Sequence, residues 1–170
     1  EKIAATAAKL GLQTSMLEHW DDEATDKVLY ADLTGANVAA WQGGSVANFY
    51  RINPARPAGP LIARENVRYF RQYSDYIRPG DRRIGASSSN RRLAAPVAFQ
   101  GPDGALVIVI RVSAAGQAEI PGLPAGTYHV SYATQSGSGE IEQPFAVVDG
   151  TPLIVKMPDA GVITVTSRPD

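Results

Sequence analysis

The feature that most constrains the fold is a series of short apolar segments separated by turn residues in the second half of the chain. The turn Gly101-Pro102-Asp103-Gly104 separates AAPVAFQ from ALVIVIRV, a pattern typical of a β-hairpin. Further turns containing glycine precede TYHVSYAT, EIEQPFAVV, TPLIVKM and VITVTS. Alternating segments with regularly spaced turns predict an antiparallel β-sandwich over residues 93–170, so the chain should be mainly β.

Composition supports a packed domain and excludes several classes of protein. The chain has 170 residues, of which 44% are hydrophobic and 19% are charged, and its formal net charge is −1. This balance argues against a general nucleic-acid binder or a polybasic membrane-surface protein. The lack of cysteine excludes disulfides, thiol nucleophiles and cysteine-ligated metals, and only two histidines are present. No metal or other cofactor is expected, and no apolar run predicts a membrane-spanning helix.

Residues 1–50 have a different pattern, in which helical and extended segments alternate. The opening EKIAATAAKLGL predicts a helix that ends near Gly11, and strands are predicted at residues 12–17 and 37–41. Between them, Asp21-Asp22-Glu23 predicts the N-terminus of a helix that stops at Gly35. This order is typical of an α/β unit with parallel strands. Because the first residues already have the pattern of mid-helix, we expect a processed or truncated chain, the alternative being a native helix without its initiator methionine.

Residues 51–92 form a Pro- and Arg-rich linker. A helix is predicted over residues 60–77, because Pro60 suits a first helical turn and Pro79-Gly80 ends the apolar stripe. The linker contains ten arginines and three acidic residues. Such a segment can bind phosphate or nucleic acid, but arginine mixed with tyrosine on a helix favours carboxylate pairing and packing.

Glu18 is the first candidate for chemistry. It directly follows the predicted strand at 12–17 and begins the loop into a helix. In an α/β barrel, catalytic groups lie at the carboxyl ends of strands, so a carboxylate here can act as a nucleophile or as a general acid or base. The alternative is an exposed glutamate in a strand–helix loop.

Aromatic residues accompany this carboxylate. Trp41 and Gln42 end the next predicted strand, and Trp20 follows Glu18 closely. An aromatic ring beside a carboxylate suits sugar binding, because the C–H face of a pyranose packs on the ring; the alternative for Trp41 is a core position. His19, Asp21 and Asp22 do not predict a metal site, since neighbouring side chains point in different directions.

One stretch resembles a known family. The residues ENVRYFRQYSDYIRPGDRRIGASSSNRRLAAPVAFQGPDGALVIVI resemble the junction between barrel and β-sandwich in glycoside hydrolase family 30. That family carries a helix ending in F-S-x-F-I-R-P-G-x-x-R-I. The matching positions are Phe70, Ser74, Tyr76, Ile77, Arg78, Pro79, Gly80, Arg83 and Ile84.

The resemblance extends to both sides of this motif. TSMLEHW resembles the seventh barrel strand of the family and ANVAAWQ the eighth, which implies that Glu18 is the nucleophile and that Trp41 contacts sugar. Trp20 and Gln42 complete the expected substrate-binding set. Gly43-Gly44, the Pro-rich loop at 53–60 and the His-Trp-Asp-Asp after Glu18 depart from the family pattern.

The resemblance implies the C-terminal part of a retaining glycosidase that acts on β-linked glucosides or xylan, in a secreted or periplasmic bacterial setting. A complete (β/α)₈ barrel needs roughly 250 residues. Residues 1–50 supply two strands and two helices, so the acid/base carboxylate is missing and the chain alone should be inactive. The alternatives are a non-catalytic carbohydrate-binding sandwich and a structural module. Because the barrel strands would lack neighbours, we also expect a homo-oligomer formed through residues 1–50.

Overall fold

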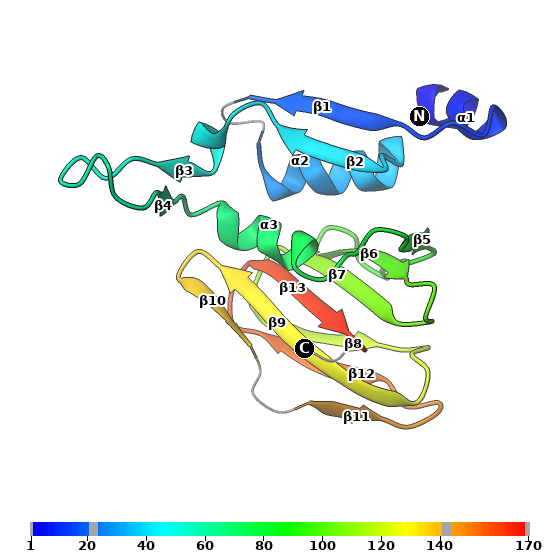
Figure 1. Cartoon of the computed structure of the whole chain (residues 1–170). Coiled ribbons are helices and arrows are strands. Elements are labelled where there is room, and N and C mark those ends of the chain that lie inside the picture. The colour runs from blue at the N-terminus through cyan, green and yellow to red at the C-terminus, as the bar shows by residue number, and fades with distance from the viewer. Residues whose placement is uncertain (1, 21–23, 141–143, 169–170) are drawn as a thin grey trace. The chain divides into compact units, whose positions relative to one another are not determined.

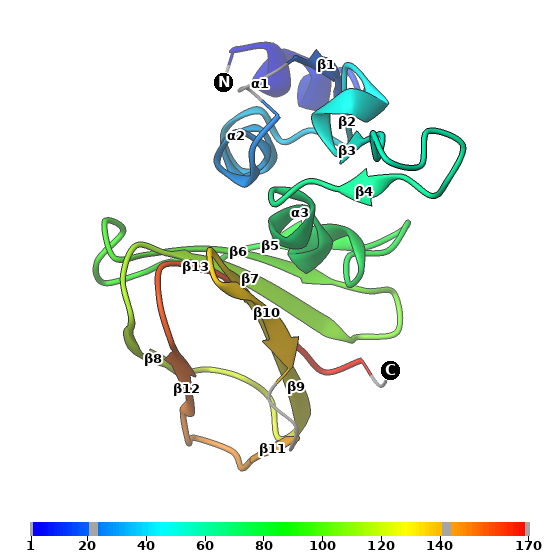
Figure 2. The same ribbon diagram turned by 90° about the vertical axis from the view of Figure 1, so that its left-hand side faces the viewer.

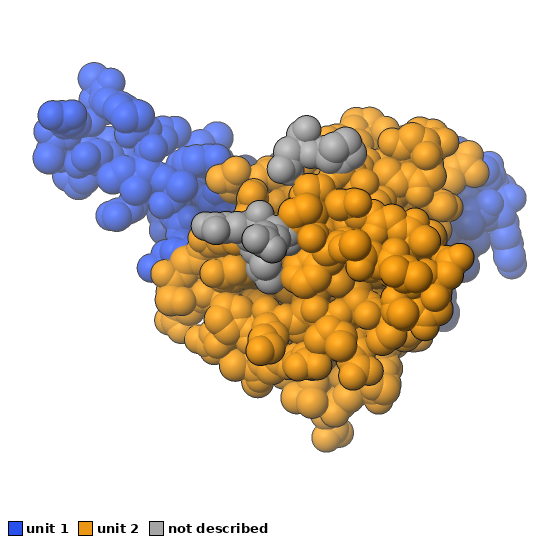
Figure 3. Space-filling view, turned by 90° about the horizontal axis from the view of Figure 1, so that it is seen from below, with its two compact units in different colours: residues 1–70 blue, residues 71–170 orange. Residues whose placement is uncertain are grey.

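The computed structural model describes residues 2–20, 24–140 and 144–168 (Figure 1). The chain separates into two compact units, residues 1–70 and residues 71–170, which are coloured separately in Figure 3. The division falls inside helix α3 (Val67–Ser74). The expected segment boundaries at residues 50 and 92 stay predictions. Within the described residues, no helix has the length and apolar character needed to cross a membrane.

The first unit contains the predicted pair of parallel strands. Helix α1 (Lys2–Lys9) is followed by Gly11, whose φ of +66° suits the end of a helix. Strand β1 (Ser15–His19) pairs in parallel with β2 (Ala40–Gly43), and Met16 lies opposite Trp41. Both strands lie two or three residues further along the chain than predicted.

The helical segment between these strands also differs in detail. Helix α2 (Asp26–Ala31) begins after Thr25, whose hydroxyl accepts a hydrogen bond from the Val28 amide at 3.2 Å. The predicted acidic N-terminus at Asp21, Asp22 and Glu23 lies outside the described residues. After α2 the chain widens into a π-helix, η2 (Asp32–Ala36), which ends at Asn37 with a φ of +52°.

The helix predicted over residues 60–77 is wrong in its bounds. Strand β4 (Ile62–Ala63) pairs with β3 (Tyr50–Arg51), which follows the short 3₁₀ helix η3 (Val46–Asn48). The Arg64 amide then bonds the Phe49 carbonyl at 2.7 Å. Because these residues engage an extended partner, the helix starts only at Val67, and it ends at Ser74. Pro60 therefore does not lie in a first helical turn.

The second unit is the predicted antiparallel sandwich. Its large sheet has the strand order β10-β9-β13-β7-β6-β5, with β11 also paired to β9, and β8 with β12 forms a separate second layer (Figure 2). The bounds are β5 (Arg82–Ile84), β6 (Ala94–Gln100), β7 (Leu106–Val112), β8 (Gly116–Ile120), β9 (Gly126–Thr134), β10 (Gly137–Glu140), β11 (Phe145–Val147), β12 (Leu153–Met157) and β13 (Gly161–Thr166). The turn predicted at Gly137-Ser138-Gly139 is wrong, because these residues belong to β10. Of the predicted strand EIEQPFAVV, Glu140 ends β10 and Phe145–Val147 form β11, and residues 141–143 lie outside the described residues.

The core lies between these two layers. Alternate residues of β7, Leu106, Ile108 and Ile110, join Leu153 and Val155 of β12 in one buried apolar cluster. Tyr128 is also buried there, and its hydroxyl donates to the Pro124 carbonyl at 3.0 Å. Burial raises the pKa of Tyr128 above its ordinary value, because the phenolate would lose its hydration.

The C-terminal half of α3 covers the opposite face of the large sheet. The Gln72 side chain accepts a hydrogen bond from the Ser131 hydroxyl at 2.9 Å, and its backbone carbonyl accepts one from the Thr164 hydroxyl at 2.7 Å. Tyr73 is 3% exposed. These contacts confirm the predicted packing of the linker helix on the sandwich, through the last turns of a shorter helix.

Candidate functional site

Glu18 and Trp20 form an exposed pair at the carboxyl end of β1. Glu18 lies inside the strand, one residue before its end, rather than just after it as predicted. Its side chain accepts a hydrogen bond from the indole N–H of Trp20 at 3.1 Å. Trp20 is 52% exposed, so the structure brings a carboxylate and an accessible aromatic surface together.

Gly44 holds this aromatic ring close to the backbone. A Cβ atom added to Gly44 would lie 2.5 Å from Cε2 of Trp20, so the indole occupies the space that any other side chain needs. The Gly44 amide bonds the His19 carbonyl at 2.7 Å and joins the ends of the two strands. Gly43-Gly44, which departs from the family pattern, thus has a local packing role. A Cβ on Gly43 would likewise meet the Phe49 ring at 2.5 Å.

A second cluster surrounds Asp32, which sequence reasoning missed. Its Oδ2 accepts hydrogen bonds from Nε2 of His19 at 2.7 Å and from Nε1 of Trp41 at 2.9 Å. The His19 and Trp41 rings stack at a centroid distance of 5.4 Å. The available signal was electrostatic: an acidic residue after the last turn of a helix opposes the helix dipole, so its position needs another explanation.

Trp41 is held within an aromatic cluster. Besides His19, its ring contacts Phe70 at a centroid distance of 5.1 Å, and Phe70 meets Phe49 edge-on at 5.0 Å. Trp41 is half-buried, whereas Gln42 beside it is exposed. The four predicted site residues therefore divide into the pair Glu18 and Trp20, the clustered Trp41, and the exposed Gln42.

The chemistry available here is that of a carboxylate beside an indole. Across the residues that the structure describes, no three His, Asp or Glu side chains are grouped as a metal site would require. Asp21 and Asp22 fall outside those residues. An exposed carboxylate next to an aromatic face can bind a saccharide by ring packing and can act on its anomeric carbon.

The arginines of the linker make contacts of the kind favoured by the sequence. Arg71 pairs with Asp75 at 2.7 Å along α3, and Arg78 donates to the Ser74 carbonyl at 3.1 Å. Asp81 accepts two hydrogen bonds from Arg168, near the other end of the chain. Carboxylate and carbonyl partners thus engage part of this basic segment.

The fold resembles parts of solved glycoside hydrolase structures. No protein-family model matches the chain, and no curated protein sequence matches it. The solved structures that it resembles include a family 44 xyloglucanase from Paenibacillus polymyxa, at a TM-score of 0.61 and 14% identity over 92% of this chain and 32% of that chain.

The family 30 xylanases superpose with higher scores. The subfamily 8 xylanase Xyn30A from Clostridium acetobutylicum matches at a TM-score of 0.78 and 15% identity, over 95% of this chain and 44% of that chain. Xylanase C from Talaromyces cellulolyticus gives a TM-score of 0.73 and 17% identity, over 93% and 41%. The chain therefore has a partial family 30 fold, as the sequence resemblance implies, and spans less than half the length of either xylanase.

Proposed function

We propose that this chain is the C-terminal portion of a retaining glycoside hydrolase that acts on β-linked glycosides of the glucoside or xylan type. The observation that carries the proposal is the exposed pair of Glu18 and Trp20 at the carboxyl end of a parallel strand. In this fold class that end of the strand faces the substrate. The similarity to xylanases supports the choice of a saccharide.

In this proposal Glu18 is the nucleophile. One of its carboxylate oxygens bonds to the anomeric carbon while the glycosidic C–O bond breaks, and the leaving oxygen takes a proton from a second carboxyl group. Water then cleaves the glycosyl ester. The two carboxyl groups must lie about 5 Å apart, and the family resemblance assigns the second one to an earlier barrel strand. The chain alone should therefore show no more than trace hydrolysis of xylan or simple aryl β-glycosides.

An activated substrate tests the nucleophile without the missing acid. A 2,4-dinitrophenyl 2-deoxy-2-fluoro-β-glycoside releases a stable phenolate that needs no proton, so the first bond exchange can occur with one carboxylate. We expect prolonged incubation with the xylosyl or glucosyl reagent to add one glycosyl group per chain. Peptide mass spectrometry should place this group on Glu18.

Two variants control the labelling experiment. Glu18→Gln should remain unlabelled, whereas Glu140→Gln, the same change at another exposed residue, on β10, should label like the parent chain. Labelling of other carboxylates, or equal labelling of Glu18→Gln, would show that Glu18 is not the nucleophile. No labelling of the parent chain would contradict the proposed function and favour a non-catalytic role.

The substrate-binding residues of this proposal are Trp20, Trp41 and Gln42. The exposed indole of Trp20 would pack against the sugar, while the contacts of Trp41 with His19 and Phe70 hold the Trp41 ring in place at the side of the site.

A secreted location is also part of this proposal. It is supported by a similar structure described as a conserved exported protein from Bacteroides fragilis, at a TM-score of 0.65 and 17% identity. That match covers 83% of this chain and 32% of that chain.

The alternative is a non-catalytic sandwich module with a binding or a supporting role. Binding through a surface row of aromatics would need exposed rings at Trp41 and at the tyrosines of α3. Tyr73 is instead 3% exposed and Trp41 is half-buried. Between the two non-catalytic roles, these buried and half-buried positions favour a structural role over carbohydrate binding.

We also propose that residues 1–50 mediate self-association. In the described part of the chain β1 and β2 pair only with each other, although parallel strands are usually covered on both faces. Leu17 on β1 is 66% exposed and Leu12 just before it is 62% exposed. Burial of such surface contributes roughly 25 cal/mol per Å², so a symmetric dimer is the expected solution.

Sedimentation velocity at micromolar concentration tests this association. The parent chain should sediment as a dimer, and Leu17→Asp should shift it to a monomer, because a charge would be buried at the interface. Ile154→Asp is the matched control, since this side chain is also exposed but lies on β12 of the sandwich. A monomeric parent chain, or dissociation by both variants alike, would contradict an interface formed by residues 1–50.

A further inference from the structure

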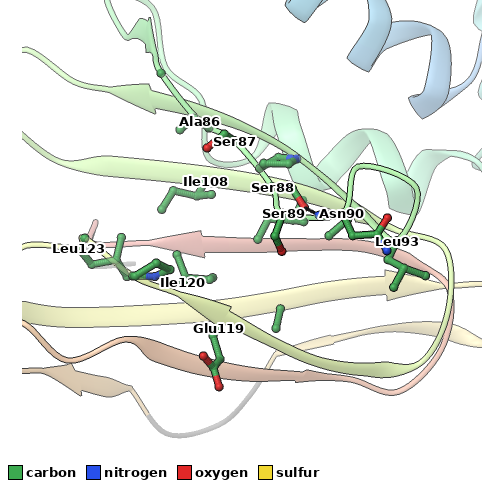
Figure 4. A pocket seen from close by; sticks show the side chains of 18 of the residues that line it. Ala86, Ser87, Ser88, Ser89, Asn90, Leu93, Ile108, Glu119, Ile120 and Leu123 are labelled. Carbon is green, nitrogen blue, oxygen red and sulfur yellow. Dashed lines mark hydrogen bonds between the residues drawn. The ribbon is translucent and has the colours of Figure 1, made fainter.

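The sandwich contains a cavity of about 760 Å³ in the second unit, distinct from the residues of the candidate site. Figure 4 shows the segment 86–90 on one side of it and Glu119, Ile120 and Leu123 on the other, with Ile108 between them. This volume lies within the usual range for small-molecule sites, which is about 300–1,000 Å³.

Pro96 accounts for the opening of the sandwich at this place. Strand β5 pairs with β6 only as far as Ile84 opposite Ala98, and continuing that register would set Ala86 opposite Pro96. Proline has no amide hydrogen to donate to a ladder, so pairing on that edge stops there. Residues 85–89 thus leave the sheet, and the cavity lies between this segment and residues 117–123, which include β8.

Aliphatic side chains of different sizes line the interior of the cavity. The floor consists of Ala98, Leu106, Ile108 and Ile110 from β6 and β7, and Ala118 and Ile120 come from β8. The 21 lining residues include no aromatic and no basic side chain. Glu119, the single acidic residue among them, is exposed, and its side chain points away from segment 86–90 in Figure 4. The lining around Ile108 is therefore aliphatic and carries no positive charge.

Residues 87–90 give one side of the cavity a polar lining, and Ser88 among them supplies a group that can bind a polar ligand end. Along residues 84–89, exposure alternates, so that Ala86 and Ser88 are partly buried while Ser87 and Ser89 are exposed. The Ser88 hydroxyl oxygen accepts a hydrogen bond from the Asn90 amide at 3.1 Å. Within the described residues its own proton has no acceptor, so it can donate to a ligand oxygen.

We propose that this cavity binds an uncharged aliphatic molecule with a terminal oxygen acceptor, such as an alcohol or an ester, with the chain over Ile108 and the oxygen at Ser88. A saccharide alone would lack its usual aromatic platform here, and a fatty carboxylate or phosphate would find no cation. Because Ala86, Ala98 and Ala118 have small side chains, they leave the space that the aliphatic part of the ligand would occupy.

Isothermal titration calorimetry with 1-octanol tests the proposal on the full chain. We expect saturable binding of 1-octanol at one site, and at least tenfold weaker binding of octanoate, because its charge would enter an uncharged interior. In methyl NMR spectra, 1-octanol should shift Ile108 and leave Ile154, exposed on β12, unchanged. No binding, equal binding of octanoate, or equal shifts at both isoleucines would overturn the proposal.

Matched variants separate the cavity from a general effect. Ala118→Leu and Ala86→Leu fill the space from opposite walls and should each abolish binding, while Ala146→Leu, the same change at an exposed position of β11, should not. Ser88→Ala should weaken binding about fivefold, the cost of one neutral hydrogen bond, and Ser87→Ala should leave it unchanged. Retained binding in both cavity-filled variants would contradict the site, and melting curves show whether each variant is folded.

Discussion

Replacing Ile163 by alanine should lower the free energy of unfolding of the sandwich by about 4 kcal/mol, because the change deletes buried methyl groups and leaves a cavity. Ile163 is 1% exposed and lies on β13, the strand that pairs with both β7 and β9. Its neighbours in the ladder are Ile110 and Tyr132. Hydrogen exchange of the β7 and β13 amides at increasing urea concentration measures the loss for this unit separately.

Ile154→Ala is the control for this experiment. It removes the same atoms from β12, but Ile154 is 45% exposed, so its loss should stay below about 1 kcal/mol. A loss at Ile163 as small as that at Ile154 would show that the two sheets do not pack as a close core. Similar large losses at both positions would contradict the outward orientation of Ile154.

Asp81→Asn should destabilise the same unit by about 3 kcal/mol, because it leaves the partly buried guanidinium of Arg168 with only the exposed carboxylate of Asp103, 3.9 Å away. Arg168 donates to both carboxylate oxygens of Asp81 and also to the Tyr76 carbonyl at 2.7 Å. The Asp81 side chain is 1% exposed and that of Arg168 is 17% exposed. The pair thus connects Arg168, two residues after β13, to the segment between α3 and β5.

This ion pair also predicts how stability depends on pH. The hydrogen bond from Arg168 lowers the pKa of Asp81 below its ordinary value of 3.8, although burial acts in the opposite direction. A carboxyl group with a lowered folded-state pKa stabilises the fold above its unfolded pKa and loses that contribution as the pH falls through the folded value. The parent chain should therefore lose stability below about pH 4 more steeply than Asp81→Asn.

Asp75→Asn provides the comparison for Asp81. Asp75 pairs with Arg71 one helical turn away, but the two side chains are 40% and 68% exposed, so the loss should be under about 0.5 kcal/mol. Urea denaturation at pH 7 and at pH 3 measures all three proteins. Equal effects of the two substitutions at pH 7, or the same acid sensitivity with and without Asp81, would contradict the role of the buried pair.

The fold class follows from local patterns in the sequence. The hairpin around Gly101–Gly104 forms as predicted, and Gly104 has the positive φ of 83° that favours glycine at this turn. Strand alternation predicts which residues of β7 face the core, because successive side chains point to opposite sides of a sheet. The parallel pairing of β1 with β2 follows from a helix between two apolar segments.

The start of helix α3 cannot be predicted from local sequence patterns. Residues 62 and 63 belong to the apolar stripe of a helix, but they pair with residues 50 and 51. Local propensity is a weak term, and a partner distant in sequence overrides it once the chain has folded back.

The candidate site likewise contains some residues that the sequence identifies and others that only the folded structure identifies. Glu18 is identifiable from its place after an apolar run, and its hydrogen bond with Trp20 joins residues two positions apart. The helix-dipole signal marks Asp32 as unusual but does not identify its partners, since His19 and Trp41 lie 13 and 9 residues away. The sandwich cavity likewise depends on Pro96, segment 85–89 and β8 being brought together. Local periodicity and turn chemistry in the sequence predict most strands of the sandwich, the hairpin turn at Gly101–Gly104 and the candidate carboxylate Glu18, because these signals are local. The Asp32 cluster and the cavity depend on contacts between distant segments, which no local pattern encodes, so they could be recognised only in the folded chain.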